Sequence, residues 1–515
     1  MSFVRSLATV SGLTIVSRIA GFIRDALTAV YLGAGYQSDA FFVAQRLPNL
    51  FRSLFAEGAF SAAFVPLYTA EKERNGEETA KRFAGEALGL LIALLTPFTF
   101  LLIIGMPWII RIMAPGFYDE PEKFELAVRL SRITFPFLLL VSITALQTGV
   151  LNARGIFGPG ATAPILLNIV LILALLIADL MGFETGLTLA WAMLFAGALQ
   201  TTWLALSCYR ARAAVPLLRP KLTTETKRLF KKIGPGAIGA GAAQINLLLT
   251  TVLASTLPTG AISFLYYADR LNQLPLGIIG IAVATTLLPI LSQHETAGNN
   301  KLVRHYVNRA IEFSLLLGLP AAIGLGLAAK PIIQTLFEHG AFTHQDTIET
   351  AKALAAYSLG VPAFLLVKVF AARFFARQDT RTPVKIALFS MLVNVTGALI
   401  LLGPLQHIGM ALALSIATWA NATLLYITLR KQDQALIDNK LKKRLPRLIF
   451  SALIMSSATY LLVFMTQTWF ADGALLLKIG GLACIIGLSS LVYFVLLQVT
   501  GAFRLKDMIK YTKKD

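Results

Sequence analysis

Long apolar stretches recur along almost the whole chain, separated by short polar segments. An α-helix rises about 1.5 Å per residue, so about 20 apolar residues cross the hydrocarbon core of a bilayer. Fourteen stretches reach that length. They lie at residues 3–33, 37–71, 79–113, 123–155, 158–183, 186–213, 225–257, 260–295, 302–327, 347–378, 383–404, 407–432, 445–468 and 474–500. The pattern predicts an all-α polytopic membrane protein with fourteen transmembrane helices.

Charge alternates from one connecting segment to the next. Basic residues concentrate around residues 72–82, 154, 210–232, 301–304, 377–385, 440–447 and in the tail after 503. The intervening loops, such as GAGYQS at 33–38 and LPTG at 257–260, contain almost no lysine or arginine. The positive-inside rule therefore places both termini and the basic loops in the cytoplasm. An even number of spans agrees, because it returns the chain to its starting side.

Composition supports the same class of protein. The chain has 515 residues, of which 56% are hydrophobic and 14% charged, with a formal net charge of +19. In a soluble protein such a charge favours nucleic acid as the partner. Here the basic residues lie mostly in the predicted cytoplasmic loops, so membrane topology explains the charge. No nucleic-acid partner is therefore expected. Cys208 and Cys484 lie in hydrophobic segments and are expected to be buried thiols.

No motif for catalysis, metal binding or ATP hydrolysis occurs in the sequence. The five histidines are scattered, and the patterns HExxH, GxSxG and GxxxxGK[ST] are absent. We therefore predict neither an enzyme nor a cofactor or metal site.

Two halves of the chain resemble each other at an offset of about 225 residues. Pro136 corresponds to Pro362 and Asn168 to Asn394, while AFFVAQRLPNL in the second span resembles FLYYADRLNQL in the eighth. Repeats six helices apart share one orientation in the membrane, which predicts two parallel six-helix lobes with a binding site between them. Chance similarity between apolar helices is the alternative.

The predicted domains follow from this repeat. The first lobe covers residues 1–213, an amphiphilic cytoplasmic linker 214–224, and the second lobe 225–432. Residues 433–515 hold two further helices and a basic tail. These two helices either add structural packing or form a groove for an acyl or polyprenyl tail.

Charged residues inside the predicted spans are the strongest functional signal. Each costs about 2.5–3.5 kcal/mol at the bilayer centre, so such residues should face a polar interior. Ten of them form the candidate group, six basic and four acidic: Arg18, Arg24, Arg46, Arg52, Arg270 and Lys368 against Asp25, Asp39, Glu57 and Asp269. Buried salt bridges explain single residues equally well, but they leave a cationic surplus. Arginine binds phosphate oxygens bidentately, so the surplus favours an anionic cargo such as a diphosphate.

The second span shows how these charges are arranged. On a helical wheel, Asp39, Arg46, Ser53 and Glu57 share one face, whereas Arg52 points away from it. One wall of a polar cavity therefore does not account for every charge.

Three segments resemble the MurJ (MviN) family. They are SRIAGFIRDALTAVYLGAGYQSDAFFVAQRLPNLFRSLFAEGAFSAAFVP, YYADRLNQLPLGIIGIAVATTLLP and RQDTRTPVKIA. The resemblance implies a flippase of the multidrug/oligosaccharidyl-lipid/polysaccharide exporter superfamily in the bacterial inner membrane. Its cargo would be lipid II, the undecaprenyl-diphosphate-linked precursor used for peptidoglycan synthesis and cell shape.

The resemblance also implies functional residues. By matching motif they are Arg18, Arg24, Asp39, Arg52, Glu57, Ser263, Asp269, Arg270 and Lys368. Arg18, Arg24 and Arg270 would bind the diphosphate, supported by Arg52 and Lys368. The acids Asp39, Glu57 and Asp269 would orient the arginines and stabilise one gate state. Arg46 stands where another basic residue is expected, while Ser53 and Gln273 depart from the expected arginine and acid.

Several alternatives remain at this stage. A flippase for another polyprenyl-diphosphate glycan, such as O-antigen or capsule lipid, would share the cationic cavity. A multidrug exporter of cations would need an acidic one, and a glycosyltransferase or phosphatase would need catalytic motifs. We expect a monomer that touches membrane lipids and, transiently, the cell-wall synthesis machinery. Either the membrane potential or an ion gradient would drive it.

Overall fold

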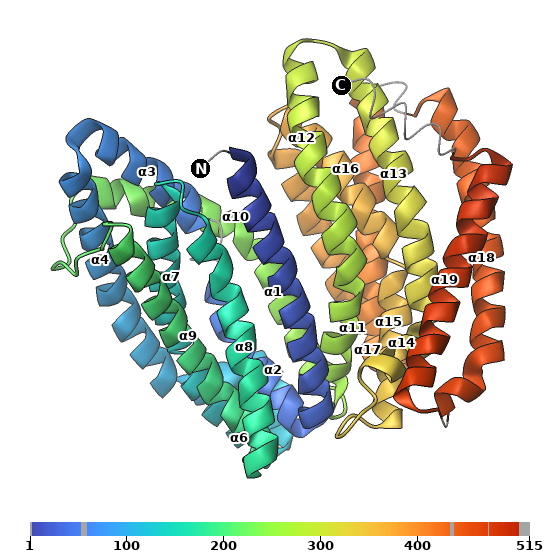
Figure 1. The fold of residues 1–515 in the computed structure, drawn as a ribbon, viewed down its shortest axis with the longest axis horizontal. Coiled ribbons are helices and arrows are strands. Elements are labelled where there is room, and N and C mark those ends of the chain that lie inside the picture. The colour runs from blue at the N-terminus through green and yellow to red at the C-terminus, as the bar shows by residue number, and fades with distance from the viewer. Residues whose placement is uncertain (1–2, 53–58, 433–436, 472, 504–515) are drawn as a thin grey trace. The chain divides into compact units, whose positions relative to one another are not determined.

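The computed structural model describes residues 3–52, 59–432, 437–471 and 473–503, and all secondary structure within these ranges is helical (Figure 1). Ten helical segments in the described part are long and apolar enough to cross a membrane. The chain is therefore an all-helical multi-pass membrane protein, as the hydrophobic pattern predicts.

The chain divides into two compact units, each with its own core. The first contains residues up to Ser263 together with His339–Phe342, and the second contains the remainder. Helices of the first unit are α1 Phe3–Leu32, α2 Tyr36–Arg52, α3 Ala59–Asn75, α4 Glu77–Ile104, α5 Met106–Met113, η2 Pro115–Asp119, α6 Pro121–Thr134, α7 Phe137–Asn152, α8 Gly158–Met181, α9 Thr185–Arg210 and α10 Thr224–Ser255.

The second unit begins three residues into α11. Its helices are α11 Ala261–Pro275, η3 Leu276–Gly280, α12 Ile281–Thr296, α13 Asn300–Leu327, α14 Ala329–Leu336, α15 His344–Ser358, α16 Val361–Ala376, α17 Arg381–Gln432, α18 Asn439–Ala471 and α19 Leu475–Thr500. The lobe boundaries predicted from the repeat remain a prediction, because compact packing and sequence repetition are different criteria.

Several predicted spans consist of two helices that meet at a glycine or proline. The stretch 123–155 is α6 followed by α7, with Pro136 directly before α7. The stretch 347–378 is α15 followed by α16, with Pro362 in the first turn of α16. Proline lacks the backbone N–H that would continue the preceding helix. The two prolines matched in the repeat thus interrupt the helices at corresponding places.

Two other interruptions have a different geometry. After Pro275, a π-helical turn at Leu276–Gly280 joins α11 to α12. Within α17, Gln406 has φ 48° and ψ −131°, so the predicted spans 383–404 and 407–432 are two helices joined at this kink. Such a φ is uncommon for a residue with a side chain.

Aromatic rings fill the core between α3, α4 and α7 in the first unit. Phe64 stacks on Phe60 and on Phe83 with ring centroids 5.2 and 5.6 Å apart. In the second unit, α12, α13 and α16 share a core of aliphatic side chains such as Val307 and Leu365.

Helices α18 and α19 pack on α13 in the second unit. The Tyr493 hydroxyl donates to the Leu316 carbonyl at 3.0 Å, and Thr459 donates to Ser489 at 2.9 Å. Large apolar side chains on their outer surface, such as Leu453 and Phe464, stay more than half exposed. These two helices are therefore anchored by buried polar contacts and present an apolar face outward.

Residues 213–223, here called the strap, run without helical structure along α4 before α10 begins. A Cβ atom at Gly89 would lie 2.1 Å from the Leu218 carbonyl oxygen, and one at Gly85 would lie 2.6 Å from that of Pro216. The two glycines stand one turn apart on the same face of α4. They allow close approach of the extended strap to the helix.

We expect Gly89→Ala to lower the thermal stability of the purified protein, because the methyl group displaces the strap. Overpacking of this kind typically costs about 1–3 kcal/mol. Gly487→Ala in α19 is the matched control, since a Cβ there meets open space. Both variants gain the same helix propensity, so the difference between their melting temperatures isolates the strap contact. Equal melting temperatures would contradict the close approach.

Candidate functional site: charged clusters within the membrane helices

Arg24 in α1 is held by two neighbouring side chains. Its Nε and Nη2 donate to Asp25 Oδ1 at 3.1 and 2.6 Å, and its Nη1 donates to Asn168 Oδ1 at 2.9 Å. Asn168 is buried on α8 and donates through Nδ2 to the Ser17 carbonyl at 3.1 Å. The Arg24 side chain is 14% exposed. It therefore has a fixed position while part of it stays accessible.

Arg18 lies on the same helix but is exposed. The sequence left open a buried pair of Arg18 with Asp25; in the structure Asp25 binds Arg24. Arg18 and Arg24 thus differ in environment, although both are predicted to bind the same group.

Asp39 is almost fully buried at the start of α2. Its carboxylate accepts from the backbone N–H groups of Gly260 at 2.8 Å and Ser263 at 3.0 Å, and from the Ser263 hydroxyl at 2.6 Å. The free N–H groups at a helix N-terminus attract anions, so Asp39 acts as a cap for α11 supplied from a distant part of the chain. Ser263 also donates to the Ser38 hydroxyl at 2.9 Å.

Lys123 in α6 supplies the positive charge beside Asp39. Its Nζ lies 3.2 Å from Asp39 Oδ2 and donates to Thr259 Oγ1 at 3.0 Å, and both charged side chains are 2% exposed. Glu120 lies 3.6 Å away, and the Phe117 ring lies 4.4 Å from the ammonium. The lysine thereby joins α2, the start of α6 and the segment before α11.

Sequence reasoning missed Lys123 because it stands at the first position of the predicted span 123–155, next to a polar segment. The helical spacing of Lys123 relative to the following apolar residues could have identified it. Lys123 shares its face with Leu126, Ala127 and Leu130, all buried, so a lysine at that spacing points into the core. Asn168 was noticed only as part of the repeat, and nothing in the sequence connected it with Arg24.

The structure describes only some of the other candidates in the predicted second span. Arg46 is half-buried, and Arg52 donates through Nε to Asn49 Oδ1 of the same helix at 3.2 Å. Glu57 and Ser53 lie outside the described residues. The polar stripe predicted along this span is therefore described only as far as Arg52.

The second unit places its candidates on α11 and α16. The Arg270 guanidinium stacks over the Tyr266 ring at 4.7 Å and donates through Nη2 to the Tyr266 hydroxyl at 3.0 Å. Asp269 accepts a hydrogen bond from Gln273 one turn later. Lys368 is exposed, with Nζ 5.1 Å from the Phe364 ring centroid. Gln273 thus places an amide donor beside Asp269.

Other charges of the second unit form structural ion pairs. Glu295 pairs with Arg373 and Arg377, and Glu312 pairs with Arg309 and Arg444. These pairs join α12 to α16 and α13 to α18.

Asp438 extends the second of these groups outside the membrane-spanning segments, where Arg309 Nη2 lies 2.6 Å from its carboxylate. Burial raises the pKa of Asp438, but the Leu441 N–H bond and the Arg309 charge outweigh it and hold the pKa below its usual value.

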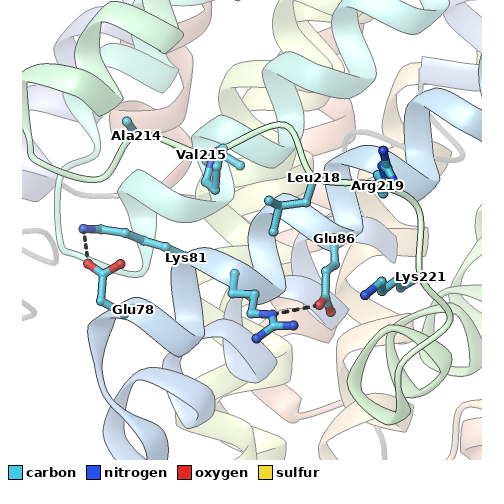
Figure 2. A pocket seen from close by; sticks show the side chains of 10 residues that line it. Glu78, Lys81, Glu86, Ala214, Val215, Leu218, Arg219 and Lys221 are labelled. Carbon is cyan, nitrogen blue, oxygen red and sulfur yellow. Dashed lines mark hydrogen bonds and ion pairs between the residues drawn. The ribbon is translucent and has the colours of Figure 1, made fainter.

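An open groove of about 760 Å³ lies between α4 and the strap (Figure 2). Its charged lining residues are Glu78, Lys81, Arg82, Glu86, Arg219 and Lys221. Glu86 is buried and binds Arg82 on one side and the Thr223 hydroxyl on the other, at 3.3 and 3.1 Å. None of these lining residues belongs to the candidate site predicted from the sequence.

The fold is that of known membrane transporters. A solved inward-facing multidrug resistance MATE family transporter of the MOP superfamily matches with a TM-score of 0.71 at 16% identity, covering 83% of this chain and 98% of that one. At this identity the likeness concerns the fold alone. Fold and apolar helices together define a multi-pass membrane protein whose fold is similar to that of this transporter.

Sequence relatives define the family. The family described as Lipid II flippase MurJ matches residues 28–480. The probable lipid II flippase MurJ of Rhizobium tropici is 40% identical over 509 residues, covering 97% of this chain and 95% of the relative. That of Rhizobium meliloti (strain 1021) is 44% identical over 467 residues, covering 90% and 87%. The chain belongs to the MurJ family of lipid II flippases, as the sequence motifs predicted.

A solved structure agrees with this assignment. The structure described as Lipid II flippase MurJ, inward closed conformation, matches with a TM-score of 0.80 at 27% identity, covering 97% of this chain and 99% of that chain.

We expect Lys123→Met to destabilise the protein strongly, because it leaves the buried Asp39 carboxylate without its cation. Breaking one partner of a buried pair costs about 3–5 kcal/mol. The double variant Asp39→Asn with Lys123→Met should unfold at a higher temperature than Lys123→Met alone, since it removes both charges. Thermal unfolding in detergent measures the difference. A double variant less stable than Lys123→Met alone would show that the pair is not coupled.

Proposed function

We propose that this protein moves lipid II from the cytoplasmic to the periplasmic leaflet for peptidoglycan synthesis. The observation that carries the proposal is the match to curated lipid II flippases over nearly the whole chain at 40% identity. The cationic surplus among its intramembrane charges supports the same cargo, because the diphosphate of lipid II is anionic.

Arg18, Arg24 and Arg270 bind the diphosphate in this proposal, with Arg52 and Lys368 in support. Arg24 is the best prepared of them, since Asp25 and Asn168 fix its guanidinium before the cargo arrives. A preorganised guanidinium loses little freedom on binding, which favours affinity. The stacking of Arg270 on Tyr266 has the same consequence.

Asp39 and Ser263 act as a latch rather than as contacts to the cargo. Their hydrogen bonds tie α2 to the N-terminus of α11, and Lys123 balances the charge. If these hydrogen bonds broke, water would reach the Asp39 carboxylate and the Lys123 ammonium. Water would then solvate both charges, so they would be stable without pairing. The latch can therefore hold one state of a transport cycle and release in another. Arg46, Glu57 and Asp269 complete the polar lining.

The proposed topology has fourteen spans, with both termini in the cytoplasm of the bacterial inner membrane. Two parallel six-helix lobes alternate access, and α18 and α19 hold the polyprenyl tail. Corresponding helix breaks at Pro136 and Pro362 support the repeat. The apolar outer face of α18 and α19 supports contact with a lipid chain.

We further propose that transport needs no nucleotide or cofactor and that the monomer is the working unit. Outward movement of an anionic cargo is favoured by an inside-negative potential at about 2.3 kcal/mol per charge per 100 mV. Transient contact with the enzymes of cell-wall synthesis would supply and remove the cargo.

The test is complementation in a bacterium depleted of this protein, read out as the fraction of lipid II accessible on the outer face. Depletion should lower that fraction, and the wild type should restore it. Arg24→Ala should fail at a normal protein level, because losing a charge-assisted bond weakens binding roughly tenfold or more. Arg210→Ala, which removes an exposed arginine at the end of α9, is the control and should restore it.

Two results would reject the proposal. If lipid II exposure stayed unchanged after depletion, in a strain without a second flippase, the proposed flippase function would be wrong. Full restoration by Arg24→Ala would remove the assigned role of Arg24.

A further inference from the structure

The groove between α4 and the strap is a formed site rather than a gap between mobile segments. Gly85 and Gly89 let the strap backbone lie against α4, and the Glu86 carboxylate holds the strap's last residue, Thr223. Thr223 in turn accepts from Thr226 N–H and caps α10. Both walls are thus fixed by contacts with buried atoms.

The charge of the groove is positive. Lysines and arginines at positions 81, 82, 219 and 221 face two glutamates. Glu78 is engaged by Lys81 at 2.8 Å, and Glu86 by Arg82. Arg219 and Lys221 reach the groove from the strap, opposite the α4 residues (Figure 2). Two positive charges therefore exceed the acidic charge of the lining.

Exposed apolar side chains, here called the apolar strip, lie at the far end of α4 and include Phe100 and Ile104. This helix is a candidate membrane span. Phe100 returns to the face of Arg82 five helical turns later and is 65% exposed. On the strap itself, Leu217 and Leu222 are 69% and 64% exposed. The charged groove thus lies at one end of a candidate membrane span, and exposed apolar side chains lie at the other end.

We propose that this groove binds the phosphate of an anionic glycerophospholipid, whose acyl chains lie along the exposed face of α4. A soluble phosphate would use the cations but not the apolar strip or the exposed leucines, and this favours the lipid. The inference goes beyond the proposed transport function and needs only that α4 spans the membrane. Bound lipid would fix the strap, and with it the start of α10, at the membrane surface.

Native mass spectrometry of the full-length protein in detergent tests this, with equimolar phosphatidylglycerol and phosphatidylcholine as probes. The wild type should bind phosphatidylglycerol preferentially. The double variant R219Q/K221Q should reduce that preference about tenfold, whereas R219K/K221R should keep it. The matched control is K231Q/K232Q, which removes the same charge from exposed positions on α10 outside the groove and should behave as the wild type.

Three results would overturn the proposal. Equal losses in R219Q/K221Q and K231Q/K232Q would indicate general attraction to an anionic surface. Displacement of the lipid by millimolar glycerol 3-phosphate would indicate a soluble phosphate as the ligand. No preference in the wild type would leave the groove without this role. Because the readout is phospholipid binding, it stands apart from lipid II exposure, which measures the proposed transport function.

Discussion

A charge placed in the low-dielectric interior of a membrane protein must be compensated, and this constraint organises the site. The carboxylate of Asp39 is nearly removed from solvent, so it needs both the N-terminus of α11 and the ammonium of Lys123. Arg24 meets the same requirement differently, through one carboxylate and one neutral amide. Asp39 thereby finds its partners inside the protein, whereas part of the Arg24 side chain stays accessible.

Charged residues that join helices therefore differ from those proposed to bind the cargo. Ion pairs such as Glu295 with Arg373 join helices and leave little charge to offer. The guanidinium of Arg270 lies over the Tyr266 ring, which helps to position it. Cations held in fixed positions are suited to bind a diphosphate, the group proposed for the cargo.

The sequence predicted most of the fold because its strongest signals are local. Apolar length located helices such as α8, and family motifs identified the chain. The break between α6 and α7 was not predicted, because apolar length alone gives 123–155 as one span. Two things could not be found this way. Asn168 lies more than 80 residues from Arg24 in sequence, and so does Lys123 from Asp39, so only the folded chain brings these pairs together. The contact of the strap with Gly85 and Gly89 was not predictable either, because two glycines at helical spacing are also typical of ordinary helix packing.

The central claim is that the intramembrane cations recognise the diphosphate of a lipid-linked cargo. Its most direct test is the affinity of the purified protein for lipid II and for undecaprenyl phosphate, which carries the same chain on a single phosphate, measured at increasing salt. The account predicts tighter binding of lipid II, an advantage that shrinks as salt screens the charges. Equal affinities that do not change with salt would contradict it.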